Sequence, residues 1–166
     1  MPKAKHPVTA AIRALRAAKV SFEPRLYDYV EHGGTRRSAA ELGVDEHAVI
    51  KTLVLENEHG DPLLVLMHGD QRVSTKRLAR LLGVKTIKPC DPAVATKHTG
   101  YLVGGTSPLG TRRTMDVYMQ SSICALPRMV INGGKRGFLV ELSPSDLMRV
   151  VSPQLVDVAD DGGAPG

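Results

Sequence analysis

A short apolar run at residues 49–56 constrains the fold more than any other segment of the chain. It is too apolar and too short for a surface helix, so we expect a strand. A turn at 57–61 and a second apolar run at 62–67 follow, which together predict a β-hairpin. In the first strand, the alternation of side chains places Lys51 on the same face as Leu53.

Segments with helical spacing or capping residues surround this hairpin. We expect a first helix over residues 7–19 capped by Thr9, a short helix that starts at a capping box formed by Ser38 and Glu41, and further helices over 74–82, after Asp91 and after Ser143. Further strands are predicted at 21–29, 114–118, 128–131, 138–142 and 155–158. Helices and strands do not alternate strictly and no internal repeat is present, which favours a mixed α/β fold.

The length of 166 residues, of which 42% are hydrophobic, suits one domain with a proper core. We expect this domain to span residues 1–158 and a flexible, glycine-rich tail to span 159–166. No segment approaches the roughly 18 apolar residues that a membrane helix needs, so we expect a cytoplasmic protein.

The net charge and the positions of cysteine and histidine limit which partners and metal sites the sequence predicts. The formal net charge of +5 favours an anionic partner such as a nucleic acid, although a mildly basic soluble surface would give the same value. Cys90 and Cys124 belong to no metal-binding or disulfide pattern, and the histidines are scattered. We therefore expect two buried, reduced thiols, no metal and no cofactor.

Lys51 is the first candidate functional residue because it places an ammonium group inside the most apolar stretch of the chain. Lysine is rarely buried without a partner, since removing its charge from water is costly. One interpretation is a lysine that extends to water from the start of a strand. The functional interpretation is a lysine that meets a phosphate or a developing negative charge.

Two glycine-rich segments are the other candidates. Residues 104–110 read Gly-Gly-Thr-Ser-Pro-Leu-Gly, and residues 132–137 read Asn-Gly-Gly-Lys-Arg-Gly. Glycine lets the main chain approach a ligand and turn its N–H groups toward an anion, although a tight turn and a hairpin loop are the plain alternatives. Neither segment has the spacing of a phosphate-binding P-loop or of a dinucleotide fingerprint.

Conventional catalytic motifs are absent from the sequence. There is no GxSxG elbow, no HExxH and no obvious Cys–His pair. A hydrolase of this sequence would depend on positioning, electrostatics and groups of the substrate itself.

Three motifs, Lys51-Thr52-Leu53, residues 99–110 (Thr-Gly-Tyr-Leu-Val-Gly-Gly-Thr-Ser-Pro-Leu-Gly) and residues 133–137, closely resemble the YbaK-type Cys-tRNA(Pro) deacylases. These proteins are stand-alone relatives of the editing domain of bacterial prolyl-tRNA synthetases. Their order and spacing match from the first helix to about Val158. The resemblance implies a single α/β domain with a mixed β-barrel-like sheet flanked by short helices.

The resemblance also implies an activity, hydrolysis of the ester between a mischarged amino acid and the terminal adenosine of tRNA(Pro). The substrate cysteine thiol would attack its own ester, so no protein nucleophile is needed. The implied partners are the acceptor end of tRNA and a prolyl-tRNA synthetase. Lys51 and Gly104 correspond to the catalytic positions, and the implied substrate-binding residues are Tyr27, Thr52, Gly105, Thr106, Ser107, Asn132, Gly133, Gly134, Lys135 and Arg136.

Two positions depart from the family pattern. Asn132 stands where a serine is usual, and Leu139 stands where an acidic residue is usual. Asn132 can still donate and accept hydrogen bonds, whereas Leu139 cannot replace a carboxylate. A deacylase for alanyl- or seryl-tRNA therefore remains an alternative, as does a non-catalytic module that binds tRNA or a synthetase.

Overall fold

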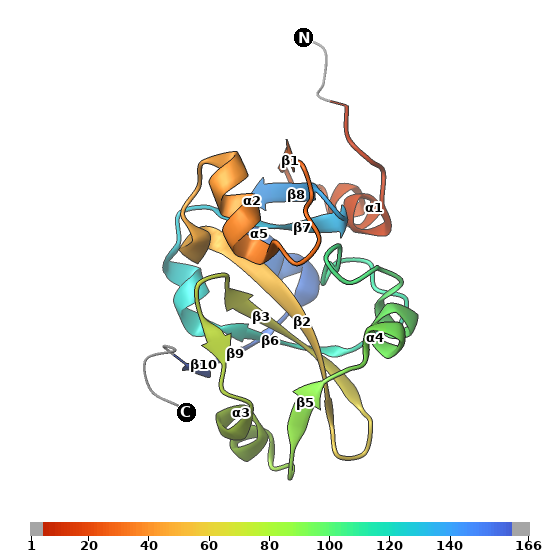
Figure 1. Cartoon of the computed structure of the whole chain (residues 1–166), viewed down its shortest axis with the longest axis vertical. Coiled ribbons are helices and arrows are strands. Elements are labelled where there is room, and N and C mark those ends of the chain that lie inside the picture. Colours follow the sequence, from red (N-terminus) through yellow and green to blue (C-terminus); the bar gives the residue numbers. More distant parts are fainter. Residues whose placement is uncertain (1–4, 161–166) are drawn as a thin grey trace.

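A mixed sheet of eight strands forms the centre of the protein, seen here in a computed structural model that describes residues 5–160 (Figure 1). Seven strands follow one path, in the order β1, β8, β7, β2, β3, β6 and β9, and β5 pairs with β2. The strands are β1 (Glu23–Leu26), β2 (Val49–Asn57), β3 (Pro62–His68), β5 (Ile87–Pro89), β6 (Asp116–Gln120), β7 (Met129–Lys135), β8 (Phe138–Leu142) and β9 (Gln154–Val156). The mixed α/β class expected from the sequence is confirmed.

Five α-helices flank the sheet in the described part of the chain. They are α1 (Ala10–Ala17), α2 (Gly34–Leu42), α3 (Thr75–Leu82), α4 (Pro92–Thr99) and α5 (Pro144–Val151), with two 3₁₀ turns, η1 (Glu46–Ala48) and η2 (Ser121–Ala125). The side chains of Thr9, Ser74 and Ser143 each accept a hydrogen bond from a backbone N–H in the first turn of the helix that follows. Asp91 precedes α4 without such a bond.

The predicted capping box at Ser38 is wrong. The α2 helix begins at Gly34, and Ser38 lies inside it, almost fully buried. Its hydroxyl donates to the carbonyl of Thr35 at 3.1 Å, one turn earlier. A serine inside a helix can form this local bond as readily as it caps a helix start, so the local motif alone could not place the helix boundary.

The hairpin of β2 and β3 is confirmed, with Lys51 opposite Met67. The strand predicted at 21–29 is confined to β1, and the strand predicted at 155–158 is observed as β9. Three short strands were not predicted, namely β5 and a separate two-stranded sheet of β4 (Arg72–Val73) and β10 (Ala159–Asp160). The first two residues of the expected tail thus pair with β4, and the rest of that tail, 161–166, lies outside the described residues.

Each face of the sheet buries its own apolar side chains. The helices α1 and α5 cover one face through a large cluster that includes Ile12, Leu66 and Leu147. On the other face, α2 covers Val49, Val130 and Leu139, while α3 covers a separate cluster with Leu53, Leu55, Val65 and Met67. Figure 1 shows α2 at one end of the sheet and α3 at the other. Lys51 therefore lies on this face, between the α2 cluster and the α3 cluster, as strand alternation predicted.

The cysteines differ from expectation in one respect. Both are free, but Cys90 is buried and Cys124 is exposed, so the prediction of two buried thiols is wrong for Cys124. Burial raises the pKa of the Cys90 thiol to about 11, which keeps it protonated at neutral pH. None of the helices in residues 5–160 combines the length and the apolar character needed to cross a membrane.

The two serines provide a test of the helix boundaries. We expect Ser74→Ala to lower the free energy of unfolding by about 1 kcal/mol, because the N–H of Arg77 loses its acceptor. Ser38→Ala should change it by less than about 0.5 kcal/mol, because alanine favours the helix interior and offsets the lost side-chain bond. Urea unfolding followed by circular dichroism measures both. A larger loss for Ser38→Ala than for Ser74→Ala would contradict the helix boundaries described above.

Candidate functional site

The parallel pairing of β2 with β7 brings two of the predicted site residues together. Its register joins Val49 to Val130 and Ile50 to Ile131. The next residues on the two strands are Lys51 and Asn132, which therefore lie side by side. Both lie on the same face of the sheet as Val49 and Val130. The helix α2 covers Val49 and Val130 on this face.

Lys51 is half-buried and has no acidic partner within ion-pair distance in the described residues. Its ammonium group donates a long hydrogen bond of 3.4 Å to the carbonyl of Gly69. Burial lowers the pKa of Lys51, Arg72 lowers it further, and the carboxylates of Glu46 and Asp70 oppose this shift. The site therefore holds a partly desolvated cation that an incoming anion can pair with.

Asn132 joins the two glycine-rich segments. Its amide nitrogen donates to the carbonyl of Gly104 at 3.1 Å. Its amide oxygen accepts from the backbone N–H groups of Gly134 at 2.7 Å and Lys135 at 3.1 Å. One side chain thus ties the loop at residue 104 to the end of β7, where β7 pairs irregularly with β8 between Asn132 and Lys135.

The two segments pack so tightly that glycine is required at their contact. A Cβ atom at Gly104, where φ is +91°, would lie 2.6 Å from the hydroxyl of Tyr29. A Cβ atom at Gly105 would lie 2.8 Å from the backbone nitrogen of Arg136. Such distances are too short for any side chain, so the main chains themselves form the wall of the site. The N–H of Gly104 has no hydrogen-bond acceptor among residues 5–160 and can donate to a ligand.

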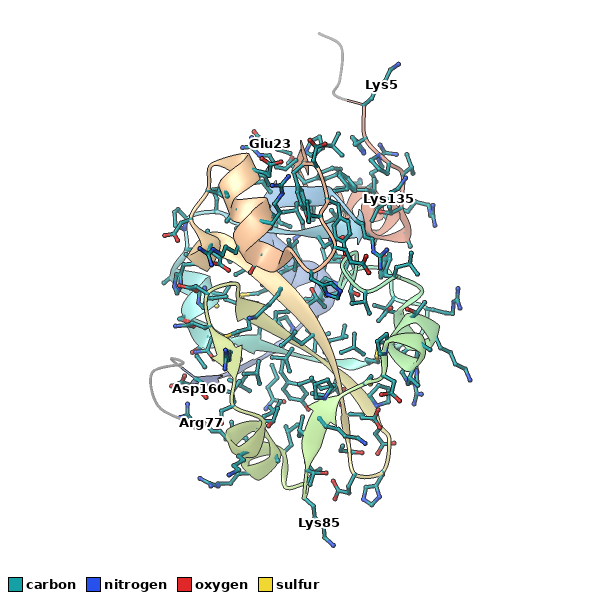
Figure 2. All side chains as sticks on the ribbon, in the orientation of Figure 1. Lys5, Glu23, Arg77, Lys85, Lys135 and Asp160 are labelled. Atoms are coloured by element: carbon teal, nitrogen blue, oxygen red, sulfur yellow. The ribbon has the colours of Figure 1, made fainter. Side chains whose placement is uncertain are left out.

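The segment at residues 132–137 also packs closely against other parts of the chain. A Cβ atom at Gly133 would lie 2.6 Å from the ring of Phe138, and one at Gly134 would lie 2.8 Å from Tyr101. The hydroxyl of Thr9, at the start of α1, donates to the carbonyl of Gly133. Lys135 follows with its side chain exposed near α1 (Figure 2).

The side chains of three predicted residues form contacts within their own loop or lie on the opposite face of β2. Alternation places the side chain of Thr52 on the opposite face of β2, where its buried hydroxyl has no hydrogen-bond partner. Ser107 is fully buried and accepts from the N–H of Leu109 at 3.1 Å, so it shapes its own loop. Thr106 is half-buried and donates to the carbonyl of Leu102 at 3.4 Å.

Tyr27, a predicted site residue, and Tyr29 both follow β1 but have different surroundings. Tyr27 packs against the cluster beneath α2, and burial followed by the nearby Tyr29 raises its pKa. Tyr29 lies against Gly104 and beneath the guanidinium of Arg136, which is 5.3 Å from the ring centroid. Sequence reasoning missed Tyr29. The spacing of two residues between the tyrosines, which predicts a shared face, was the available signal.

The sequence also did not predict a role for the turn that carries Gly69. His68 is fully buried, and its ring bonds to the carbonyl of His47 at 2.6 Å and to the hydroxyl of Ser122 at 2.8 Å. Burial lowers the pKa of His68 below its usual value, so the ring is neutral at pH 7. These bonds hold the end of β3 and thereby the Gly69 carbonyl that faces Lys51.

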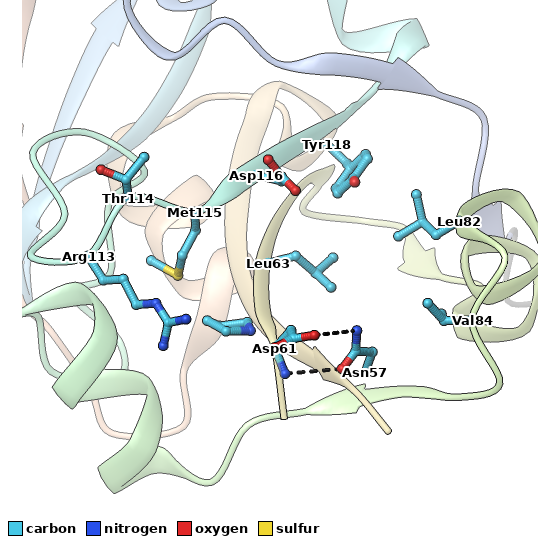
Figure 3. A pocket seen from close by; sticks show the side chains of 11 residues that line it. Asn57, Asp61, Leu63, Leu82, Val84, Arg113, Thr114, Met115, Asp116 and Tyr118 are labelled. Carbon is cyan, nitrogen blue, oxygen red and sulfur yellow. Dashed lines mark hydrogen bonds between the residues drawn. The ribbon is translucent and has the colours of Figure 1, made fainter. Parts of the chain in front are cut away.

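A cleft of about 480 Å³ lies at a different place, by the turn of the β2–β3 hairpin (Figure 3). Its lining comes from the hairpin turn, the end of α3 and the start of β6, and includes Asn57, Asp61, Leu82, Arg113, Asp116 and Tyr118. None of the predicted site residues lines it. The candidate site consists instead of Lys51, Asn132 and the main chain at Gly104.

This arrangement suits the binding of an anion or of a carbonyl oxygen that becomes negative. A half-buried ammonium group and a free backbone N–H are the donors that stabilise such charge. No group of three His, Cys, Asp or Glu side chains in residues 5–160 could hold a metal ion.

Comparisons with known proteins identify the family of the chain. The model of the aminoacyl-tRNA editing domain family matches residues 34–150. A curated relative from Enterococcus faecalis, named "Putative Cys-tRNA(Pro)/Cys-tRNA(Cys) deacylase EbsC", is 26% identical over 90% of this chain and 92% of its own. A proline–tRNA ligase from Geobacter sulfurreducens is 33% identical over 53% of this chain, a stretch that makes up 16% of the ligase.

The fold is also shared with solved structures. One of them, described as a "putative trans-editing enzyme for prolyl tRNA synthetase", has a TM-score of 0.82 at 21% identity and covers 93% of this chain and 99% of its own. A hypothetical protein, APE2540, has a TM-score of 0.83 at 22% identity and covers 92% of this chain. Because the family model spans well over half of the sequence and includes Lys51, Gly104 and Asn132, the chain belongs to the aminoacyl-tRNA editing domain family.

Proposed function

We propose that this protein removes a wrongly attached amino acid from transfer RNA by hydrolysing its ester bond, with Cys-tRNA(Pro) as the substrate. Aminoacyl-tRNA deacylase is the enzyme class that the family and the names of its relatives support. The observation that carries the proposal is the register of β2 and β7, which aligns Lys51 with Asn132, together with the hydrogen bond from Asn132 to Gly104, whose own N–H is free within residues 5–160.

Lys51 and Gly104 act on charge in this proposal. When the ester carbonyl is attacked, its oxygen becomes negative, and the Gly104 N–H donates to it. The Lys51 ammonium group either stabilises the same charge or pairs with a phosphate of the tRNA end. Neither residue forms a bond to the substrate, so both accelerate the reaction by position and electrostatics.

The attacking group comes from the substrate. The thiol sulfur of the attached cysteine forms a bond to its own ester carbonyl carbon, the ester C–O bond breaks, and the terminal ribose hydroxyl leaves with the thiol proton. Water then opens the resulting thioester and releases free cysteine. The absence of a conventional nucleophile motif from the sequence supports this route.

The choice of amino acid depends on the surroundings of Asn132 and Leu139. Asn132 accepts hydrogen bonds from two backbone N–H groups and donates one to the carbonyl of Gly104, so it links the two loops. Leu139 pairs with Asn132 across β7 and β8 and is buried beneath α2. Without a carboxylate at this position, the substrate amino group has no acidic partner there, which keeps alanyl- and seryl-tRNA as alternative substrates.

The tRNA acceptor end is the proposed partner, and a prolyl-tRNA synthetase is a second one because its editing domain is related. Tyr27, Gly105, Thr106, Gly133, Gly134, Lys135 and Arg136 remain proposed substrate-binding residues. Thr52 and Ser107 keep that role only through their backbone, since their side chains face away or are buried. A module that binds tRNA without catalysis would share these contacts.

Removal of the Lys51 charge tests the activity. We expect Lys51→Ala to slow the release of cysteine from Cys-tRNA(Pro) by about 100-fold or more, because the developing charge loses its cation. Lys85→Ala is the matched control, since Lys85 is exposed at the far end of the molecule (Figure 2). Release of labelled cysteine is the measurement. An unchanged rate in Lys51→Ala would exclude the role of Lys51, and tRNA binding without release by the native protein would favour the non-catalytic module.

A panel of charged tRNAs tests the attacking group. With Cys-, Ala- and Ser-tRNA(Pro) at the same salt concentration, we expect cysteine to be released at least about tenfold faster, because alanine lacks a thiol and serine carries a weaker nucleophile. Similar rates for cysteine and alanine would contradict substrate-assisted attack and would point to a positioned water.

Lys51 should also lower the stability of the protein. Because burial lowers its pKa in the folded state, the unfolded chain holds the proton more tightly, and stability rises with pH between the folded pKa and 10.5. We therefore expect Lys51→Met to be more stable than the native protein at pH 7, by an amount that shrinks as pH approaches 10.5. Urea unfolding from pH 7 to 10 measures this. A gap that widens with pH would show that burial is not the main cause.

A further inference from the structure

Arg136 is a cation without a carboxylate partner at the edge of the candidate site. Its Nε donates to the carbonyl of Val103 at 2.9 Å, and no residue within 5–160 accepts from its terminal nitrogens or pairs with it. The arginines at the other end of the same strands differ in this respect. Arg25 and Arg128 both pair with Glu141, at 2.7 and 3.3 Å. Within the described residues, Arg136 thus presents an unpaired charge at this end of the strands, whereas the charges at the other end are neutralised.

The guanidinium of Arg136 is held in one orientation. The bond to Val103 fixes the Nε side of the group, and its central carbon lies over the ring of Tyr29, 5.3 Å from the centroid. The residue is exposed, so the opposite face of the plane is open to solvent. An exposed planar cation beside an aromatic ring is a surface on which nucleobases stack in protein–RNA complexes.

Exposed apolar side chains extend this surface. Leu102 is 60% exposed and Val103 is 48% exposed, in a loop that lies between the buried residues Tyr101 and Gly105. The next residue is Gly104, whose main chain touches Tyr29. The stacked pair and the apolar loop thus adjoin the point where the ester is proposed to react.

We propose that Tyr29, Arg136, Leu102 and Val103 form a binding site for an unpaired nucleotide of the tRNA 3′ end, adjacent to the nucleoside that carries the ester. The base stacks on the guanidinium of Arg136 and packs against Leu102 and Val103. The terminal nitrogens of Arg136 donate to the phosphate of the same nucleotide. This inference rests on the proposed function, because it takes the ester to lie at Gly104.

The test uses two uncharged hairpin RNAs with the same stem, one with a short unpaired 3′ extension and one with a blunt end. We expect the native protein to bind the extended RNA more tightly, and Arg136→Gln and Tyr29→Leu to weaken that binding by about tenfold while leaving the blunt RNA nearly unchanged. Fluorescence anisotropy at fixed salt measures both affinities. Arg80→Gln, which removes an exposed charge from α3, is the matched control and should affect neither RNA selectively.

Conservative variants separate stacking from charge. Arg136→Lys keeps the charge but loses the planar group, so it should restore less than half of the lost preference for the extended RNA. Tyr29→Phe keeps the ring and should bind nearly as the native protein does. Circular dichroism confirms that each variant is folded.

The outcomes distinguish this site from the proposed function. Equal weakening of both RNAs by Arg136→Gln, or full restoration by Arg136→Lys, would overturn the nucleotide site without contradicting the proposed deacylase activity of the native protein. Failure of the native protein to prefer the extended RNA would also overturn it. Failure of the native protein to release an amino acid would instead count against the proposed function, whatever the RNA affinities are.

Discussion

The parallel register of β2 and β7 is the constraint on which the candidate site depends. Two residue pairs, Val49 with Val130 and Ile50 with Ile131, align strands that are far apart in the sequence. The alignment places Lys51 beside Asn132, and Asn132 in turn holds the loop at Gly104. A shift of one residue would turn either side chain to the other face of the sheet and would separate the charge from the loop.

The position of Lys51 follows from how the helices cover the sheet. The clusters beneath α2 and α3 share one face, and Lys51 lies between them. An apolar residue there would join the two clusters, whereas lysine is only partly buried and its pKa is lowered. We therefore expect lysine to cost stability at this position, which is consistent with the functional role proposed for its charge.

The glycines of the two loops allow close packing and leave a backbone N–H group free among the described residues. Gly104 and Gly105 allow one main chain to lie directly against Tyr29 and the backbone of Arg136, so that no side chain stands between the loops. The same contact leaves the N–H of Gly104 free and orients Arg136 over Tyr29. The wall of the site is thus made of backbone, which moves less than side chains do and needs little reorganisation when charge develops.

The sequence by itself determined the features that depend on local periodicity and composition. These are the β2–β3 hairpin, the face on which Lys51 lies, and the helix starts at Thr9, Ser74 and Ser143. Only the tertiary structure decided what depends on contacts between distant segments. It paired β5 with β2 and β10 with β4, placed the start of α2 at Gly34 and not at Ser38, and placed Tyr29 against Gly104. Strand pairing and loop contacts are selected by the packing of the whole chain. A local pattern therefore does not encode a partner that lies far away in the sequence.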